Sequence, residues 1–131
     1  MNVKKQPFLK ATEQIAAPLT NIASPQRIAI LLLIGEGEAC VCHLEASLGW
    51  RQAYISQHLM ALRKAGILQA RREGRFIFYS LKDIAILDLV IASATLSGLS
   101  DETVSELIST QFNQSCECPQ CTPMLISVDG E

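Results

Sequence analysis

Residues 50–81, WRQAYISQHLMALRKAGILQARREGRFIFYSL, constrain the fold of this chain more than any other segment. Its first half places apolar residues three and four positions apart, which is typical of one buried helix face. These residues are Ile55, Leu59 and Leu62. Gly66 then ends the helical pattern, because glycine is common just past the end of a helix. The spacing predicts a helix over residues 52–65.

Two short strands are predicted after this helix, at residues 68–72 and 76–81. The pair Glu73-Gly74 lies between them, and such a pair favours a tight hairpin turn. A shorter helix is predicted before Gly49, over residues 40–48. Two helices joined around a glycine and followed directly by a hairpin form a winged helix-turn-helix. We therefore predict a mainly α fold with a small β-hairpin wing, in the order α-α-α-α-β-β-α-α.

The rest of the chain completes one domain. Ser24-Pro25 is a strong helix start, since a capping hydroxyl precedes proline at the first helical position, and the apolar run after it predicts a central buried helix. We also expect a short helix from Lys10 that bends or ends at Pro18, a turn at residues 36–38, and helices over residues 82–96 and 101–111. The helix over 82–96 has more apolar side chains than the core of a small domain needs, so we expect it to contribute both to the core and to a dimer contact. The predicted parts are a flexible arm (1–9), the DNA-binding and dimerisation domain (10–112) and a flexible cysteine-rich tail (113–131).

Charge is distributed unevenly along the chain. The whole chain carries −2, whereas residues 50–82 hold seven basic residues and one acidic residue, a net +6, so the remainder carries −8. A basic patch on an acidic body attracts a polyanion to one side of a protein. The apolar share of 49% argues against a disordered chain.

Nothing in the sequence predicts a membrane span or a secretory signal. The longest unbroken apolar run, Ile28–Ile34, is far shorter than a bilayer requires. We therefore expect a cytoplasmic protein with no membrane partner, whose five cysteines stay reduced. Their grouping then favours metal or redox chemistry over structural disulfides.

The segment from Cys40 to Leu81 closely resembles the ArsR/SmtB family of winged-helix, metal-responsive repressors. The resemblance rests on the CVC start of one helix, on Ser-x-His-Leu-x-x-Leu-x-x-Ala-Gly-Ile and on Arg-x-Gly-x-x-x-x-Tyr, and it extends over residues 10–95. The matching residues of the last two motifs are Ser56, His58, Leu59, Leu62, Ala65, Gly66, Ile67, Arg72, Gly74 and Tyr79. It implies a homodimer on a palindromic operator, with repression relieved by metal. It implies neither an enzyme nor a small-molecule substrate.

The candidate DNA contacts lie on the second helix and the wing. Gln52 and Gln57 suit adenine edges, and Ser56 suits a base or a phosphate. Arginines and lysines suit phosphates, with Arg75 at the wing tip a candidate for the minor groove. The full set is Arg51, Gln52, Ala53, Tyr54, Ser56, Gln57, His58, Arg63, Lys64, Arg71, Arg72 and Arg75. Two points stay open: a solvated basic face is the simpler alternative for the charges, and His58 is either a phosphate contact or a half-buried packing residue.

Arg51 departs from the family pattern, which often has serine at this position as the helix cap. We expect the substitution to weaken the cap and to add a phosphate contact.

Five cysteines form two groups, Cys40 with Cys42, and Cys116, Cys118 and Cys121. Residues two apart in a helix face nearly opposite sides, so Cys40 and Cys42 chelate one ion only if Cys40 lies at or before the first turn, or if that turn distorts on binding. Arsenic-sensing family members have a third cysteine where this chain has Glu45. The tail cysteines either complete the site or bind As(III) alone. As(III) is the favoured inducer, followed by Cd(II) and Pb(II), and a structural Zn(II) in the tail is possible chemistry.

Two other functions stay open. One is a thiol redox-sensing repressor of the same fold. The other is a thiol oxidoreductase using Cys118 and Cys121, although that C-x-x-C lacks the βαβ surroundings of such enzymes. We do not expect the family's fifth-helix zinc site in this chain, because the only histidines, His43 and His58, lie outside residues 82–112.

Overall fold

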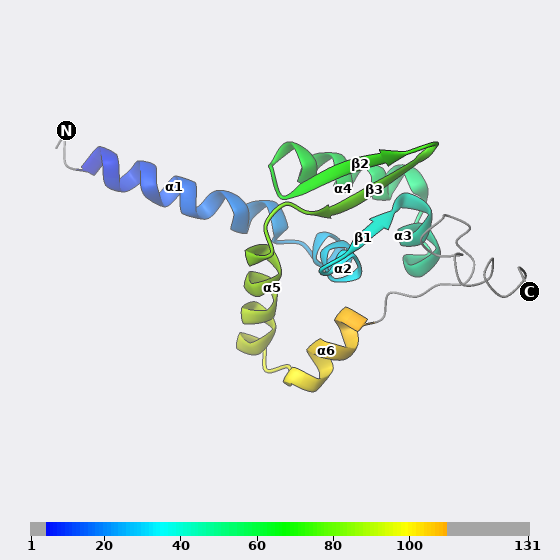
Figure 1. The fold of residues 1–131 in the computed structure, drawn as a ribbon. Helices are drawn as coiled ribbons and strands as arrows, with labels where there is room; N and C mark the ends of the chain where they lie inside the picture. Colours follow the sequence, from blue (N-terminus) through cyan, green and yellow to red (C-terminus); the bar gives the residue numbers. More distant parts are fainter. Residues whose placement is uncertain (1–4, 110–131) are drawn as a thin grey trace, which may run out of the picture.

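The computed structural model describes residues 5–109, and it confirms the mainly α winged fold. The elements in chain order are α1 (Lys5–Ile22), α2 (Pro25–Ile34), β1 (Glu38–Cys40), α3 (Val41–Leu48), α4 (Gln52–Lys64), β2 (Leu68–Glu73), β3 (Phe76–Leu81), α5 (Ala85–Leu96) and α6 (Asp101–Ser109). Figure 1 shows α1 extending away from the body, while the β2–β3 hairpin projects from the other side. This hairpin is the wing.

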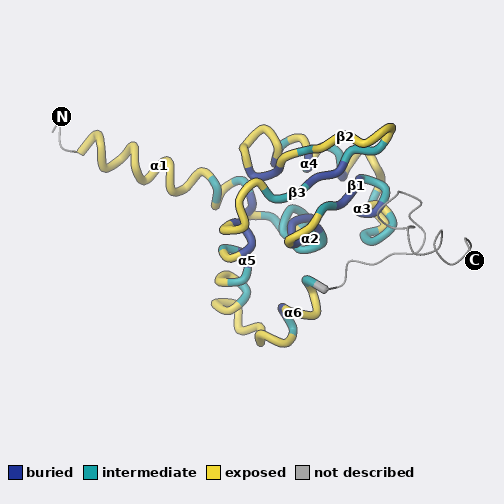
Figure 2. Tube along the Cα trace, in the orientation of Figure 1, coloured by how far each residue is buried: buried dark blue, intermediate teal, exposed yellow. Residues whose placement is uncertain are grey.

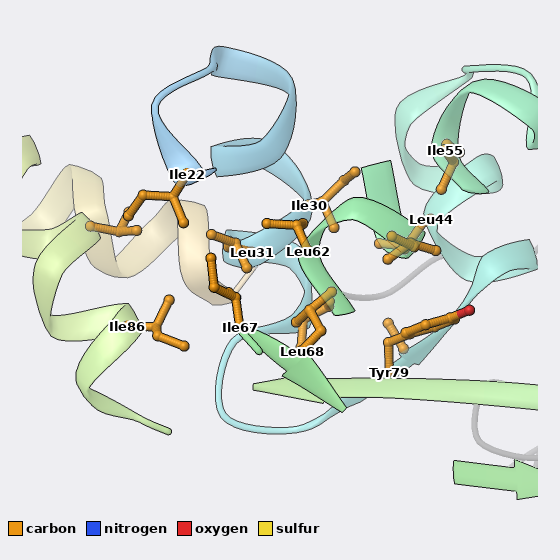
Figure 3. Packing of buried hydrophobic residues seen from close by; sticks show 14 residues of the cluster. Ile22, Ile30, Leu31, Leu44, Ile55, Leu62, Ile67, Leu68, Tyr79 and Ile86 are labelled. Atoms are coloured by element: carbon orange, nitrogen blue, oxygen red, sulfur yellow. The ribbon is translucent and has the colours of Figure 1, made fainter. Parts of the chain in front are cut away.

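Helix α2 is the central buried helix that the Ser-Pro start predicted. The Ser24 Oγ accepts a hydrogen bond from the Arg27 backbone N–H at 3.1 Å, so one of the unpaired amides at the helix start is capped. Ile30, Leu31 and Ile34 of α2 are buried. Figure 3 shows Ile30 and Leu31 packed among side chains from α1, α3, α4, α5 and the sheet.

Helices α3 and α4 form the predicted helix-turn-helix. Gly49 follows α3 with φ of 71°, a conformation that L side chains rarely adopt. Helix α4 then buries Ile55, Leu59 and Leu62 completely, as their helical spacing predicts. The opposite side of α4 is left facing solvent.

The three strands form one antiparallel sheet in the order β1-β3-β2. Cys40 of β1 and Arg71 of β2 lie opposite the same residue of β3, Phe78. Strand β1 was not predicted; its first residue, Glu38, is the last residue of the expected turn. The hairpin turn is Gly74-Arg75, one residue later than predicted, because Glu73 still pairs with Phe76. Gly74 has φ of 61° there.

The outer helices differ from expectation in their bounds. Helix α1 begins at Lys5 and continues past Pro18 to Ile22, so the prediction of a loose arm over residues 1–9 is wrong for residues 5–9. Most of α1 is exposed, as Figure 2 shows. Helix α5 begins at Ala85, three residues later than predicted, where the Asp83 carboxylate accepts a hydrogen bond from the Ala85 N–H at 2.9 Å.

The predicted tail over residues 113–131 lies outside the described residues. Within residues 5–109, no single helix is long and apolar enough to span a membrane. Helices α1 and α2 pass that test only as a pair, and the chain bends by 84° between them.

Candidate nucleic-acid interface and cysteine pair

The exposed face of α4 begins at its N-terminal end. Gln52, Ala53 and Gln57 are exposed there, and Ser56 is half-buried, while Ile55 one position away is in the core. Polar and small side chains therefore share the side of the helix that a DNA major groove would meet. The arrangement is compatible with the predicted base contacts.

Helix α4 starts without a side-chain cap. Arg51 occupies the cap position in extended conformation, and its side chain makes no capping hydrogen bond, as expected from the departure at this position. The N–H groups of Tyr54 and Ile55 bond to the Arg51 carbonyl. The side chain of Arg51 is exposed beside the face that carries Gln52.

Met60 is a residue that the sequence reasoning missed. Its side chain is 67% exposed, although it is large and apolar. It follows Ser56 and Gln57 by four and three residues, so it lies on the same helix face. That spacing was the available signal. A methionine on this face suits apolar contact with a thymine methyl group.

His58 is half-buried and packs inside the domain. Arg27 of α2 donates a hydrogen bond from Nε to the His58 Nδ1 at 3.2 Å, and another from Nη1 to the Asn21 carbonyl at 2.8 Å. The His58 ring also meets the Tyr54 ring edge-on, with centroids 4.8 Å apart. Burial, and then the nearby Arg27 charge, lower the pKa of His58. These contacts favour the packing alternative over the phosphate contact.

Arg71 of the wing is engaged by carboxylates of the protein itself. It forms two hydrogen bonds with Glu38, at 2.8 and 3.0 Å, and one with Glu73 at 3.3 Å. The Glu38 hydrogen bond raises the pKa of Arg71 above its usual range. A DNA phosphate would have to compete with these carboxylates for Arg71, so the phosphate contact of Arg71 stays a prediction. The sequence could not show the Glu38 contact, because the two residues are 33 positions apart.

The other predicted basic contacts lie on the surface. Arg72 is exposed on β2, and Arg75 is exposed in the hairpin turn at the wing tip. Arg63 and Lys64 are exposed in the last turn of α4. Their placement at the wing and at the helix end is compatible with phosphate contacts on either side of a groove.

Cys40 and Cys42 converge at the N-terminus of α3. Cys40 is both the last residue of β1 and the cap residue of α3, with φ of −87° and ψ of 165°. Its Sγ accepts a hydrogen bond from the His43 N–H at 3.3 Å and lies 2.7 Å from the Cys42 Sγ. Both residues are thiols; Cys40 is buried and Cys42 half-buried. The condition stated for chelation, that Cys40 precede the first helical turn, is met.

The cysteine pair faces a pocket of about 220 Å³. Its lining residues are Cys40, Val41, Cys42, Gln52, Arg75, Phe76 and Ile77. The pocket thus lies between the first residue of α4 and the wing tip. Anything held by the two thiols would lie beside Gln52 and Arg75, two of the predicted DNA contacts.

The described residues supply two ligands to a soft ion at this place. Within residues 5–109, no group of three or more His, Cys, Asp or Glu side chains is arranged to hold a metal ion. Glu45, at the position of the third cysteine, is exposed. His43 is buried, and burial lowers the pKa of its imidazole. Cys116, Cys118 and Cys121 lie outside the described residues.

Comparison with known proteins identifies the family. The family described as "Bacterial regulatory protein, arsR family" matches residues 24–70. The biofilm growth-associated repressor of Xylella fastidiosa is 32% identical over 95 residues, which are 72% of this chain and 83% of that protein. The chain belongs to the arsR family. Within it, the arsenic resistance transcriptional regulator ArsR1 of Pseudomonas putida is 51% identical over 51 residues, 39% of this chain and 40% of that protein.

Solved structures of the family share the fold. The transcriptional repressor BigR from Xylella fastidiosa superimposes with a TM-score of 0.62 at 32% identity, covering 73% of this chain and 96% of that one. Reduced HlyU from Vibrio cholerae superimposes with a TM-score of 0.63 at 27% identity, covering 70% of this chain and 96% of that one. The chain spans less than two thirds of the length of some curated relatives, such as 63% of the biofilm growth-associated repressor of Agrobacterium fabrum.

Proposed function

We propose that this chain is a sequence-specific transcriptional repressor that binds double-stranded operator DNA and releases it when a thiophilic metal or metalloid binds Cys40 and Cys42. Membership of the arsR family and the names of its repressor relatives support the DNA-binding part. The exposed face of α4 and the basic wing supply the groups that such binding needs. Such a repressor works in the cytoplasm, where thiols stay reduced.

The observation that carries the sensing part is the convergence of the two thiols, with their Sγ atoms 2.7 Å apart, on the pocket shared with Gln52 and Arg75. Thiolates select soft ions, so As(III) is the first candidate and Cd(II) and Pb(II) follow. A third ligand is required for a trigonal site, and the cysteines of the tail are the candidates for it. The cysteine pair lies at the start of α3, and α3 packs against α4, so the two cysteines are linked to α4 through α3.

A second candidate, a thiol redox-sensing repressor, is favoured by the same short separation. Two thiols this close in one chain need little movement to form a disulfide. One solved structure of this fold, HlyU from Vibrio cholerae, is described as the reduced protein. Oxidant and metalloid act on the same atoms in these two hypotheses, so only experiment separates them.

A homodimer is part of the proposal, because two α4 helices are needed to read a palindrome. Helix α1 leaves Phe8, Leu9 and Ile15 exposed, and Ile84, just before α5, and Leu96, at the end of α5, are exposed too. Exposed apolar side chains in such number mark an interface. We assign this surface to a second copy of the chain, which light scattering of the purified protein will test.

Titration of the reduced protein on its own promoter fragment tests the function at one fixed salt concentration. As(III), Cd(II), Pb(II), Zn(II) and the oxidant diamide are added separately, to the wild type, to Cys40→Ser/Cys42→Ser and to a chain truncated before Cys116. We expect As(III) to release the wild type and not the double variant. Release by diamide alone would select the redox candidate, and release by none would end the sensing proposal. An unaltered response of the truncated chain would show that the tail is not needed.

A further inference from the structure

A second, smaller apolar cluster lies under the wing, apart from the main core. It consists of buried Cys40 and Phe78, with half-buried Cys42 and Phe76 packed against them. The two phenylalanine rings contact each other, with centroids 6.4 Å apart and planes inclined by 37°. We call these four residues the cysteine–phenylalanine cluster. The two thiols that would hold an effector are therefore packed against aromatic rings of β3.

Each of these rings also carries an arginine of the wing. The guanidinium carbon of Arg71 lies 4.9 Å from the centroid of Phe78, and that of Arg75 lies 5.2 Å from the centroid of Phe76. Both distances are within the range of a cation–π interaction. The strand register agrees, since Cys40 and Arg71 both pair with Phe78. Phe78 thus shares a buried cluster with Cys40 and carries Arg71, and Phe76 packs against that cluster and carries Arg75.

We propose that Phe76 and Phe78 are positioning residues that hold the wing arginines and transmit the occupancy of the cysteine pair to them. Cys40 is 2% exposed and Phe78 is fully buried, so a group added to the sulfurs extends into the pocket that Phe76 and Arg75 also line. It meets the ring of Phe76 there, and we expect the arginine stacked on that ring to move with it. This inference rests on the proposed function and adds a route through the sheet to the one through α3 and α4.

Of the two stacked arginines, Arg75 should move more when the cysteine pair is occupied. Arg71 is also held by Glu38 and Glu73, which lie on β1 and β2. Arg75 lies in the turn, lines the same pocket as Cys42 and Phe76, and is exposed. Displacement of Phe76 therefore changes the position of a predicted minor-groove contact, while Arg71 stays attached to the sheet.

The first measurement compares the affinity for promoter DNA with and without arsenite in the wild type, Phe76→Leu and Phe78→Leu. Leucine keeps the apolar packing and removes the ring face. Leu81→Val, on the same strand but packed against the main core and outside the lining of the cysteine pocket, is the matched control. We expect every variant to bind arsenite with wild-type stoichiometry. The ratio of the two affinities should shrink about twofold to fivefold in Phe76→Leu, which loses the ring under Arg75, and not in the control. It should shrink less in Phe78→Leu, because Glu38 and Glu73 still hold Arg71. An unchanged ratio in Phe76→Leu would overturn the inference.

The second measurement does not depend on DNA release. In the full chain carrying Cys116→Ser, Cys118→Ser and Cys121→Ser, the two remaining thiols are capped with methyl methanethiosulfonate, and mass spectrometry confirms the capping. Amide hydrogen exchange of the wing, residues 71–77, is then compared before and after capping. We expect exchange to accelerate on capping, and to accelerate much less when Phe76→Leu is added. If arsenite does not release the wild type from DNA, the proposed function fails, and the exchange measurement alone decides the inference. Equal hydrogen exchange of the wing before and after capping would refute the inference.

Discussion

The two stacked arginines of the wing should differ in what they contribute to DNA binding. Arg75 is exposed at the tip, whereas Arg71 is engaged by Glu38 at 2.8 Å and by Glu73 at 3.3 Å. A phosphate would have to replace these carboxylates before Arg71 could release counterions from DNA. We therefore predict that Arg75→Gln changes the salt dependence of DNA binding and that Arg71→Gln leaves it nearly unaltered.

The size of the effect follows from counterion release. Each phosphate neutralised on duplex DNA contributes a slope of about −0.9 to the plot of log affinity against log salt. Between 50 and 200 mM salt this equals a change in affinity of about 3.5-fold per phosphate contact. Arg75→Gln should flatten the slope by about 0.9 for each wing on the DNA. Fluorescence anisotropy with a labelled operator at four or more salt concentrations measures it.

Glu38→Gln is the matched control for this comparison. It removes the main partner of Arg71 and leaves the arginine in place, so we expect a steeper slope than in the wild type. The fold should survive all three substitutions, because exposed ion pairs contribute at most about 1 kcal/mol to stability. If Arg71→Gln flattens the slope as much as Arg75→Gln does, Arg71 contacts phosphate despite its carboxylate partners, and the reasoning is wrong.

Three further predictions concern the fold that presents these groups. Leu59→Ala should lower the free energy of unfolding by about 2–5 kcal/mol, because its side chain is fully buried, and a urea titration will measure the loss. Gly74→Ala should lower the free energy of unfolding by about 1–2 kcal/mol through the positive φ alone, since the space around Gly74 is open. Gly74→Asn should lower it less in the same titration. A His58 pKa lowered by folding means that the unfolded chain binds more protons, so stability should fall as the pH drops below about 6.5. His58→Gln should reduce that dependence, leaving the share of His43, and equal dependence in both proteins would contradict the assignment.

The local sequence pattern was sufficient to predict the elements that depend on one helix face or on one turn. The spacing of Ile55, Leu59 and Leu62 identified the buried side of α4, and Ser24-Pro25 identified the start of α2. In each case the residues that determine the element lie within one segment of the chain. The same local pattern predicted the wing, the family resemblance agreed with it, and the comparisons confirmed the family.

Contacts between distant segments could not be predicted in this way. Strand β1 exists because residues 38–40 pair with β3, and three residues are too few for a periodic pattern. The sequence did not show that Glu38 lies beside Arg71, or that Arg27, 31 residues away, binds His58. The charge of a side chain is visible in the sequence, but the group that already binds it is not.

The unequal exposure of the two thiols has a kinetic consequence. In the proposed function, an effector arriving from solvent meets half-buried Cys42 first, because Cys40 is buried with Phe78. Capture is thus a bimolecular step at Cys42, and closure on Cys40 is an intramolecular step at high effective concentration. Escape requires both bonds to be open at once. Cys42 therefore governs how fast an effector is captured, and Cys40 governs how long it stays.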